Sequence, residues 1–390
     1  ISWGCGPATC GAAWATSDAT PVAVAERRRH RPRRPRGTSM VGTRAEVEVG
    51  PVGHGGFCVA RLDGRAVFVR HSLPGERVVI EVTEGSTGDT FWRADAVEVL
   101  SASADRVPAP CPYAGPDACG GCDFQHVSLV RQRSLKGDVV AEQLRRLAGL
   151  EVDVSVEQVP GDDQGLRWRT RQRYVERPDG GKAMRKHRSH ELVPVEECLL
   201  EAHHGPRHAA LGVDFEVADG GFWQVHPGAP DALVEAVLAY LDPRPGESAL
   251  DLYAGVGLFA RFLHERVGET GRVVAVEGDR RASRLSLTNA PGIEASAGDV
   301  GEVLATSYDH AFDLVVLDPP REGAKRRVVE QVVARSPRAV AYVACDPAAL
   351  ARDVAIFAER GYGLVSLRAF DLFPMTHHVE CVALLTKARL

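Results

Sequence analysis

The spacing of hydrophobic and polar residues changes along the chain and divides it into segments of different expected structure. From Thr43 to Val99, short apolar runs alternate with polar residues and glycine, as in RAEVEVGPVGHGGFCVARLDGRAVFV. Four or five strands at hairpin spacing predict a small closed β-barrel of the OB type. Such barrels commonly bind single-stranded nucleic acid, although a barrel used only for packing fits the same pattern.

A helical stripe and a basic segment follow. Apolar residues recur at helical spacing between residues 129 and 150, and Gly149 predicts the end of that helix. Residues 167–190, RWRTRQRYVERPDGGKAMRKHRSH, hold nine arginines and lysines against two carboxylates. Their alternation predicts a strand with one basic face, a turn at PDGG and a second basic strand. A solvated hairpin is one interpretation, but concentrated positive charge in a chain of net charge -5 favours an RNA-backbone platform.

From Gly220 onward, strand and helix patterns alternate, which predicts a parallel sheet covered by helices. An apolar strand leads into ALDLYAGVGLF, whose glycines allow a sharp turn and a close approach of the backbone to a ligand at a helix amino terminus. The next strand ends at Glu277, where a Rossmann-type fold binds ribose hydroxyls. The third ends beside Asp299, a position suited to an adenine edge, and the fourth ends at Asp318 in DPPR.

The strand VAYVA is composed of small and β-branched residues, as expected of a strand buried on both faces, and it ends at Cys345. Ligands bind at that edge of an open α/β sheet. Glu380 precedes the last expected strand, CVALLTK. Both residues also have structural interpretations without a catalytic role: Cys345 could be a packed structural thiol, and Glu380 could be a surface carboxylate. Likewise, Glu277 could be a solvated strand-end carboxylate and Asp318 a helix cap.

Length and composition limit the class of protein. The 390 residues suggest about two or three domains, and 44% hydrophobic with 25% charged residues is typical of a globular protein. Because no stretch approaches the roughly 18 uninterrupted apolar residues of a membrane helix, we expect a cytoplasmic protein without a membrane partner. Residues 1–39 are expected to be a disordered basic tail. Since the first methionine is Met40, this tail could lie upstream of the true start.

Three of the nine cysteines lie close together in a loop rich in proline and glycine, CPYAGPDACGGC. In a long chain, such clustering predicts a metal or cluster site rather than a disulfide framework. Two thiolates separated by two residues can bind one metal centre, and Cys198 is the nearest candidate for a fourth ligand. The full set is Cys111, Cys119, Cys122 and Cys198. It fits a [4Fe-4S] cluster or a zinc site, which spacing alone does not separate.

These motifs resemble known families. GHGGFCVARLDGRAVFV with LPGERV resembles a TRAM domain, an RNA-binding barrel of several RNA-modifying enzymes. The four strand ends resemble class I S-adenosylmethionine methyltransferases rather than dehydrogenases, because Ala260 replaces the third glycine of G-x-G-x-x-G. Together, FWQVHPGAPDALVEAV, DLYAGVGLFA, VVLDPPREGA, ACDPAALARD and FDLFPMTHHVECVALL resemble the RNA uracil-C5 methyltransferase family, in its cluster-bearing ribosomal-RNA branch.

The resemblance implies roles for particular residues. Cys345 falls on the family's nucleophile, and Glu380 falls on its general base. The implied S-adenosylmethionine contacts are Gln224, Tyr253, Glu277 and Asp318, with Asp299 as a further contact. The implied [4Fe-4S] ligands are Cys111, Cys119, Cys122 and Cys198.

We therefore expect an α/β protein with a TRAM barrel at 40–102, a small central α+β iron–sulfur domain at 103–219, and a Rossmann-like class I methyltransferase domain at 220–390. The expected activity is methyl transfer from S-adenosylmethionine to C5 of a uridine in 23S rRNA, through a covalent adduct of Cys345, by a monomeric enzyme. A tRNA substrate stays open. Two further alternatives are an amino-directed base methyltransferase that uses Asp318 without covalent catalysis, and a non-catalytic RNA-binding protein.

Overall fold

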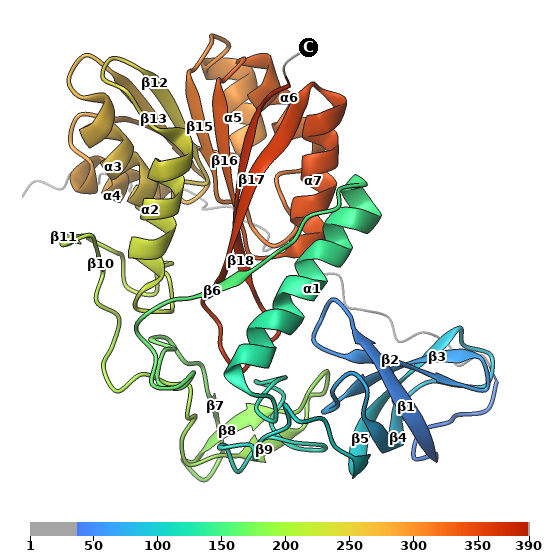
Figure 1. Cartoon of the computed structure of the whole chain (residues 1–390). Coiled ribbons are helices and arrows are strands. Elements are labelled where there is room, and N and C mark those ends of the chain that lie inside the picture. Colours follow the sequence, from blue (N-terminus) through green and yellow to red (C-terminus); the bar gives the residue numbers. More distant parts are fainter. Residues whose placement is uncertain (1–36, 389–390) are drawn as a thin grey trace, which may run out of the picture.

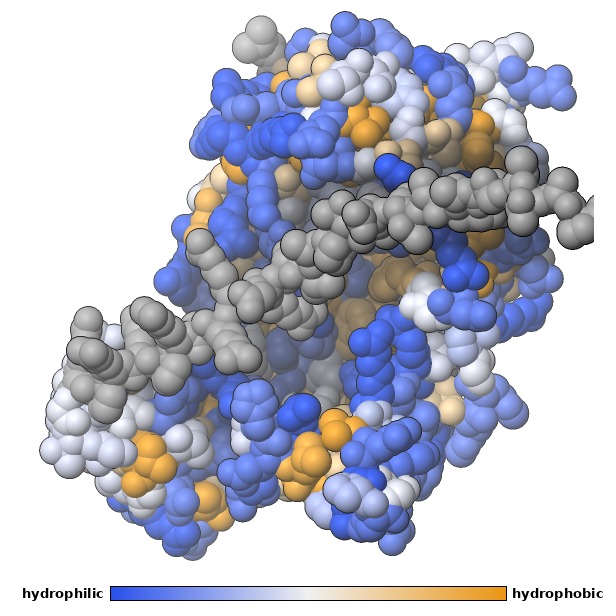
Figure 2. Space-filling view, turned by 180° about the vertical axis from the view of Figure 1, so that it is seen from behind, coloured by the Kyte–Doolittle hydropathy of each residue, from blue (hydrophilic) through white to orange (hydrophobic). Residues whose placement is uncertain are grey.

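The structure, a computed structural model, describes residues 37–388 (Figure 1). Most of the expected basic tail therefore lies outside the described residues. In chain order, the protein forms a barrel, then a central part with one long helix, and then a large sheet flanked by helices (Figure 1). No helix among residues 37–388 is both long and apolar enough to cross a membrane. The face drawn in Figure 2 is largely hydrophilic, and its hydrophobic residues form small separate groups.

The first part is a closed barrel, as predicted, with the strand order β1-β2-β3-β5-β4. Its strands are β1 (Arg44–Val52), β2 (Cys58–Leu62), β3 (Arg65–Arg70), β4 (Arg77–Glu84) and β5 (Phe91–Ser101). Alternate residues point inward, so that Val67, Val69 and Ile80 are fully buried. Parallel pairing of β3 with β5 and antiparallel pairing of β1 with β4 close the sheet without a free edge.

The predicted helix after the cysteine loop is α1 (Leu129–Ala148), which ends at Gly149 with a φ of 68°. One part of its buried face, including Leu135 and Val139, packs in the core of the barrel. Val140 and Leu144 pack instead in the core of the large sheet. A single helix therefore joins the two cores, and Figure 1 shows it running between barrel and sheet.

The basic segment is only partly as expected. The turn at PDGG and the second strand are confirmed, because β7 (Val175–Glu176) pairs with β8 (Lys182–Arg185), which continues to β9 (Leu192–Pro194). The expected strand over residues 167–174 is wrong. Trp168 is fully buried there, and the backbone N–H groups around it donate to the carbonyls of Leu199, Leu200 and Val225. These partners lie in irregular segments, so no regular ladder forms. A short pair, β10 (Ala209–Ala210) and β11 (Val213–Asp214), follows.

The large sheet has eight strands in the order β14-β13-β12-β15-β16-β18-β17-β6. Its strands are β12 (Ser248–Leu252), β13 (Arg272–Glu277), β14 (Glu294–Ala297), β15 (Leu314–Leu317), β16 (Ala339–Ala344), β17 (Tyr362–Asp371), β18 (Glu380–Lys387) and β6 (Val156–Gln158). The five from β14 to β16 are mutually parallel, and β18 runs antiparallel between β16 and β17. All six residues of β16 are buried, as its composition predicts.

Helices cover both faces of this sheet and make three layers (Figure 1). The helices are α2 (Ala229–Leu241), α3 (Leu258–Val267), α4 (Arg280–Asn289), α5 (Val300–Ser307), α6 (Lys325–Ala334) and α7 (Pro347–Glu359). One core contains buried residues of α2 and α3, and the other contains those of α1, α5, α6 and α7. The expected doubly wound α/β fold is thus present. The domain boundaries stay predictions, and β6 of the central segment adds an unexpected strand to the large sheet.

Candidate active site

The register of two strands places Cys345 and Glu380 side by side. In the antiparallel pair of β16 and β18, Ala344 is the partner of Cys381. Continuing this register by one residue sets Cys345 opposite Glu380. Opposite residues of an antiparallel pair have Cα atoms roughly 4.5–5.5 Å apart. The predicted nucleophile and the predicted base are therefore neighbours at the carboxyl edge of the parallel strands.

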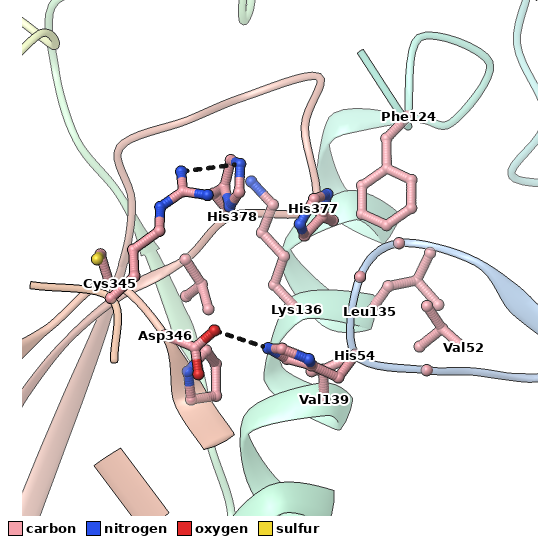
Figure 3. A pocket seen from close by; sticks show the side chains of 16 residues that line it. Val52, His54, Phe124, Leu135, Lys136, Val139, Cys345, Asp346, His377 and His378 are labelled. Atoms are coloured by element: carbon pink, nitrogen blue, oxygen red, sulfur yellow. Dashed lines mark hydrogen bonds and ion pairs between the residues drawn. The ribbon is translucent and has the colours of Figure 1, made fainter. Parts of the chain in front are cut away.

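Cys345 lines a cavity of about 210 Å³. Its walls include three parts of the chain (Figure 3): the turn after β16, the face of α1 that carries Lys136 and Val139, and the barrel loop between Val52 and Gly56. The segment before Glu380 supplies further lining side chains, with His377 and His378 near the helix in Figure 3. The cavity is thus built by the barrel and the central helix as much as by the sheet.

The acidic surroundings of this site shift its pKa values strongly. Burial, then the charges of Glu380 and Asp318, raise the pKa of the Cys345 thiol to about 12, against the opposing effect of Arg321. Burial, then Asp318, raises the pKa of Glu380 well above its ordinary value. Burial, then Glu277, raises the pKa of Asp318 to about 7. At neutral pH the thiol is therefore protonated, and the carboxyl groups of Asp318 and Glu380 are not both ionised.

Three of the five predicted cofactor residues meet at the glycine turn after β12. Glu277 accepts hydrogen bonds from the N–H groups of Gly255 at 2.8 Å and Asp279 at 2.7 Å. Tyr253, which has a positive φ of 64°, donates its N–H to the carbonyl of Val276 at 2.9 Å. The N–H of Asp318 donates to Leu252 at 3.2 Å, one residue before Tyr253. The expected meeting of strand ends is therefore present.

The other two predicted cofactor residues differ in position. Asp299 lies at the same sheet edge, because Gly298 directly before it donates its N–H to the carbonyl of Glu277 at 2.9 Å. Asp299 is the N-cap of α5, where its Oδ1 accepts the N–H of Glu302 at 3.0 Å, and its side chain is largely exposed. Gln224 lines a separate cavity of about 460 Å³ together with Arg167 and Trp223. Within the described part of the chain, none of the other predicted cofactor residues lines that cavity. Contact of Asp299 and Gln224 with a cofactor stays a prediction.

The sequence analysis assigns no role to Asp251, the acidic residue of ALDLYAGVGLF. Its side chain is fully buried, and its Oδ2 accepts the N–H of Ala260 at 2.8 Å, in the first turn of α3. The second oxygen has no hydrogen-bond partner among residues 37–388. Burial, then Asp318 and Glu277, raises the pKa of this carboxyl to about 8. An acidic residue inside an apolar strand was the signal that could have found it.

The four candidate cysteine ligands come together although one is far away in sequence. All four are free thiols and line one cavity, Cys111, Cys119, Cys122 and Cys198. Burial, then the neighbouring Cys198 and Cys119, raise the pKa of Cys122 to about 12, against the lowering effect of its hydrogen bond from Gln125. Over the described range 37–388, no three His, Cys, Asp or Glu side chains converge closely enough to hold one metal ion. The residues share a cavity without forming a single-ion site.

A doubly wound sheet with a glycine turn and strand-end carboxylates, joined to a closed barrel, defines an enzyme that binds a nucleotide-like cofactor. Residues 38–96 match the TRAM domain family, and residues 302–388 match the family described as tRNA (Uracil-5-)-methyltransferase. An "Uncharacterized RNA methyltransferase" of Streptomyces avermitilis is 44% identical over 89% of this chain and 99% of that protein. The 23S rRNA (uracil(1939)-C(5))-methyltransferase RlmD of Pseudomonas fluorescens is 30% identical over 88% of this chain and 94% of that protein.

The chain therefore belongs to the RNA uracil-C5 methyltransferase family and is an S-adenosylmethionine-dependent RNA methyltransferase. The fold agrees with this assignment. The crystal structure of Pyrococcus abyssi tRNA (uracil-54, C5)-methyltransferase in complex with S-adenosyl-L-homocysteine matches with a TM-score of 0.62, at 21% identity, over 87% of this chain and 99% of that chain.

Proposed function

We propose that this enzyme methylates C5 of a uridine in 23S rRNA through a covalent adduct between Cys345 and C6 of the base. The observation that supports the mechanism is the pairing of Ala344 with Cys381 in β16 and β18, a register that, continued by one residue, sets Cys345 opposite Glu380. A nucleophile and a base at adjacent positions, beside the carboxylates expected at the cofactor, can act on one uracil ring from one edge of the sheet.

C5 of uracil alone is too weak a nucleophile for methyl transfer. The Cys345 thiol first loses its proton to solvent, and addition of the resulting thiolate to C6 makes the ring an enolate with a nucleophilic C5, which divides one difficult step into easier ones. S-adenosylmethionine supplies the methyl group as a sulfonium. The carboxylate of Glu380 then removes the C5 proton, so that the C6–S bond breaks and the thiolate leaves. The enclosed cavity implies that the base leaves its stack to reach Cys345.

The methyl donor site we propose consists of Tyr253, Glu277 and Asp318, with Gln224 and Asp299 as further contacts. Support comes from the hydrogen bonds that join the turn after β12 to the end of β13. Glycines in that turn leave room for a ligand, and Gly257 adopts a φ of 88° directly before α3. The proposed role of Glu277 is to accept hydrogen bonds from ribose hydroxyls, the role of a strand-end carboxylate in nucleotide-binding sheets of this topology.

Ribosomal RNA is the proposed substrate because two relatives carry that name. Besides the protein of Pseudomonas fluorescens, a 23S rRNA (uracil(1939)-C(5))-methyltransferase RlmD of Shewanella sp. is 27% identical over 91% of this chain and 98% of that protein. A tRNA substrate is the second candidate, favoured by the name of the Pyrococcus abyssi enzyme. We also propose that the enzyme works as a cytoplasmic monomer.

We further propose that the four cysteines hold a [4Fe-4S] cluster, with zinc as the alternative. The support is that Cys111, Cys119, Cys122 and Cys198 line one cavity. Four thiols that line one cavity are a donor set for either a [4Fe-4S] cluster or a zinc site with four thiolate ligands. Methyl transfer moves no electrons between donor and acceptor, so the role would be structural. A brown protein with stoichiometric iron and sulfide supports this, and a colourless zinc protein contradicts it.

The proposed function is tested with RNA that contains 5-fluorouridine, whose C5 carries no removable proton. Incubation of the enzyme and S-adenosylmethionine with 23S rRNA transcribed from 5-fluorouridine triphosphate should give a denaturation-resistant complex. The same complex should be absent with Cys345→Ala. A pool of tRNA prepared in the same way decides between the two substrates. Full methylation of ordinary RNA by Cys345→Ala would contradict the covalent mechanism.

A further inference from the structure

The barrel reaches into the catalytic cavity through one side chain. His54 lies in the loop between β1 and β2, and its Nε2 is 3.1 Å from Oδ2 of Asp346 (Figure 3). Asp346 directly follows Cys345. In Figure 3 this contact spans the cavity from the barrel loop to the turn after β16. Both side chains are partly shielded, with exposed fractions of 39% for His54 and 24% for Asp346.

Asp346 also fixes the turn that carries the nucleophile. Its Oδ1 accepts the N–H of Ala349 at 2.8 Å, which makes it the N-cap of α7, with Pro347 at the start of that helix. One carboxylate therefore binds the helix with one oxygen and the barrel with the other. Any displacement of Asp346 would move the adjacent Cys345.

The barrel loop is held against this site at a second point. Gly56 has a φ of +77°, and a Cβ atom there would lie 2.6 Å from the Cβ of His377 and 3.1 Å from that of Asp123. Only glycine allows this approach. His377 is in turn bonded to Asp123, with 2.6 Å between Nδ1 and Oδ2. The position of His54 is thus set by the close packing of its loop as well as by its contact with Asp346.

We propose that His54 is a positioning residue for Cys345, which holds the turn between β16 and α7 through Asp346 and screens the carboxylate next to the nucleophile. The barrel then forms part of the catalytic structure as well as binding RNA. This inference rests on the proposed covalent mechanism. Charge supports it: Glu380, Asp318 and Asp346 all raise the pKa of the thiol after burial, and Arg321 is the cation that opposes them. His54 bonds to one of these three carboxylates, Asp346, from the opposite wall of the cavity.

The test measures Cys345 itself, without RNA. Iodoacetamide labels the intact protein at pH 8, and the rate at Cys345 is followed by mass spectrometry of its peptide. His54→Ala should slow labelling several-fold, because Asp346 loses its partner in the barrel and the turn that carries Cys345 is less well held. In the background of Asp346→Asn, which keeps a good N-cap, the same His54→Ala change should alter the rate less than about twofold. His54→Gln, which can still donate a hydrogen bond, should recover part of the rate.

Two glycine variants give a matched control. Gly56→Ala should resemble His54→Ala because it pushes the loop from the cavity, whereas Gly64→Ala places the same strain at φ +79° with nothing within 4 Å and should leave the labelling rate unchanged. The inference would be overturned if His54→Ala slowed the labelling of Cys345 equally in the wild-type and the Asp346→Asn backgrounds. It would also be overturned if His54→Ala slowed labelling in neither background. Failure of the wild-type enzyme to form the 5-fluorouridine adduct would instead contradict the proposed function, whatever the labelling rates.

Discussion

At the scale of single residues, Cys345 is a thiol surrounded by acids. Its position at a strand end could be predicted from VAYVA, because a buried apolar run that stops at a polar residue marks the sheet edge. The neighbouring Glu380 could not be located from local pattern. It comes close only because β18 inserts antiparallel between β16 and β17, a topology that no local spacing encodes. Its role was inferred from resemblance, and the register supplies an independent reason.

Glu380→Gln should separate the two halves of the reaction. Without a base, the methylated adduct forms but does not break down, and turnover should fall about 10²- to 10⁴-fold. Ordinary uridine-containing RNA should then form a denaturation-resistant complex, which the wild-type enzyme resolves. Gel electrophoresis with labelled RNA measures this. Glu359→Gln, at an exposed carboxylate that pairs with Arg326, should behave as wild type. Rapid turnover by Glu380→Gln would assign the proton to another base.

At the scale of elements, long buried strands and helices were predictable and irregular packing was not. The parallel strands follow from apolar runs, and the end of α1 follows from Gly149. The segment around Trp168 has an alternating pattern, yet its backbone groups bind separate loops and its indole is buried. Gln224 was placed with the cofactor by resemblance, and it lines a separate cavity. Alternation alone does not reveal which partner a backbone group will find.

Asp251 connects the start of α3 to the end of β12, and its titration should affect stability. The pKa of this carboxyl is raised to about 8 from an ordinary 3.8, so the folded state binds a proton that the unfolded state loses. Its contribution is therefore fully present below pH 3.8 and is lost as the pH rises through about 8.

Asp251→Asn keeps an acceptor for the N–H of Ala260 and removes the titration. Urea unfolding at pH 5 and pH 8 should show a smaller loss of stability with rising pH in this variant than in the wild type. Asp279→Asn, at the exposed N-cap of α4, is the control. This variant should keep the loss of stability between pH 5 and pH 8 that comes from Asp251. An identical pH dependence for wild type and Asp251→Asn would show that the buried carboxyl is ionised throughout.

At the scale of the whole molecule, helix α1 of the central segment supports the connection between β17 and Glu380, the proposed base. Lys136 of α1 is buried and lies 2.5 Å from Asp371, at the end of β17, and it also donates to the carbonyl of Phe373 at 3.0 Å. One turn away, Gln132 accepts the N–H of Met375 at 2.8 Å. The connection from β17 to Glu380 is therefore supported from outside the sheet.

Removing one charge of the buried pair of Lys136 and Asp371 should destabilise the fold. Lys136→Met leaves Asp371 buried without its cation and should lower the free energy of unfolding by about 3–5 kcal/mol. Lys136→Met with Asp371→Leu removes both charges and should recover most of that loss, because an apolar pair of similar volume is often neutral or stabilising. Urea unfolding measures the cycle, and methyl transfer is measured beside it.

The two readouts should differ in the double variant. Stability recovers, but the hydrogen bond from Lys136 to the carbonyl of Phe373 is lost, so the segment before Glu380 is less well held. Turnover should therefore remain about tenfold reduced, because loss of a supporting contact misplaces a catalytic group. Formation of the Cys345 adduct, which precedes the step of Glu380, should fall less than turnover does. Recovery of turnover together with stability would show that α1 stabilises the fold without positioning the base.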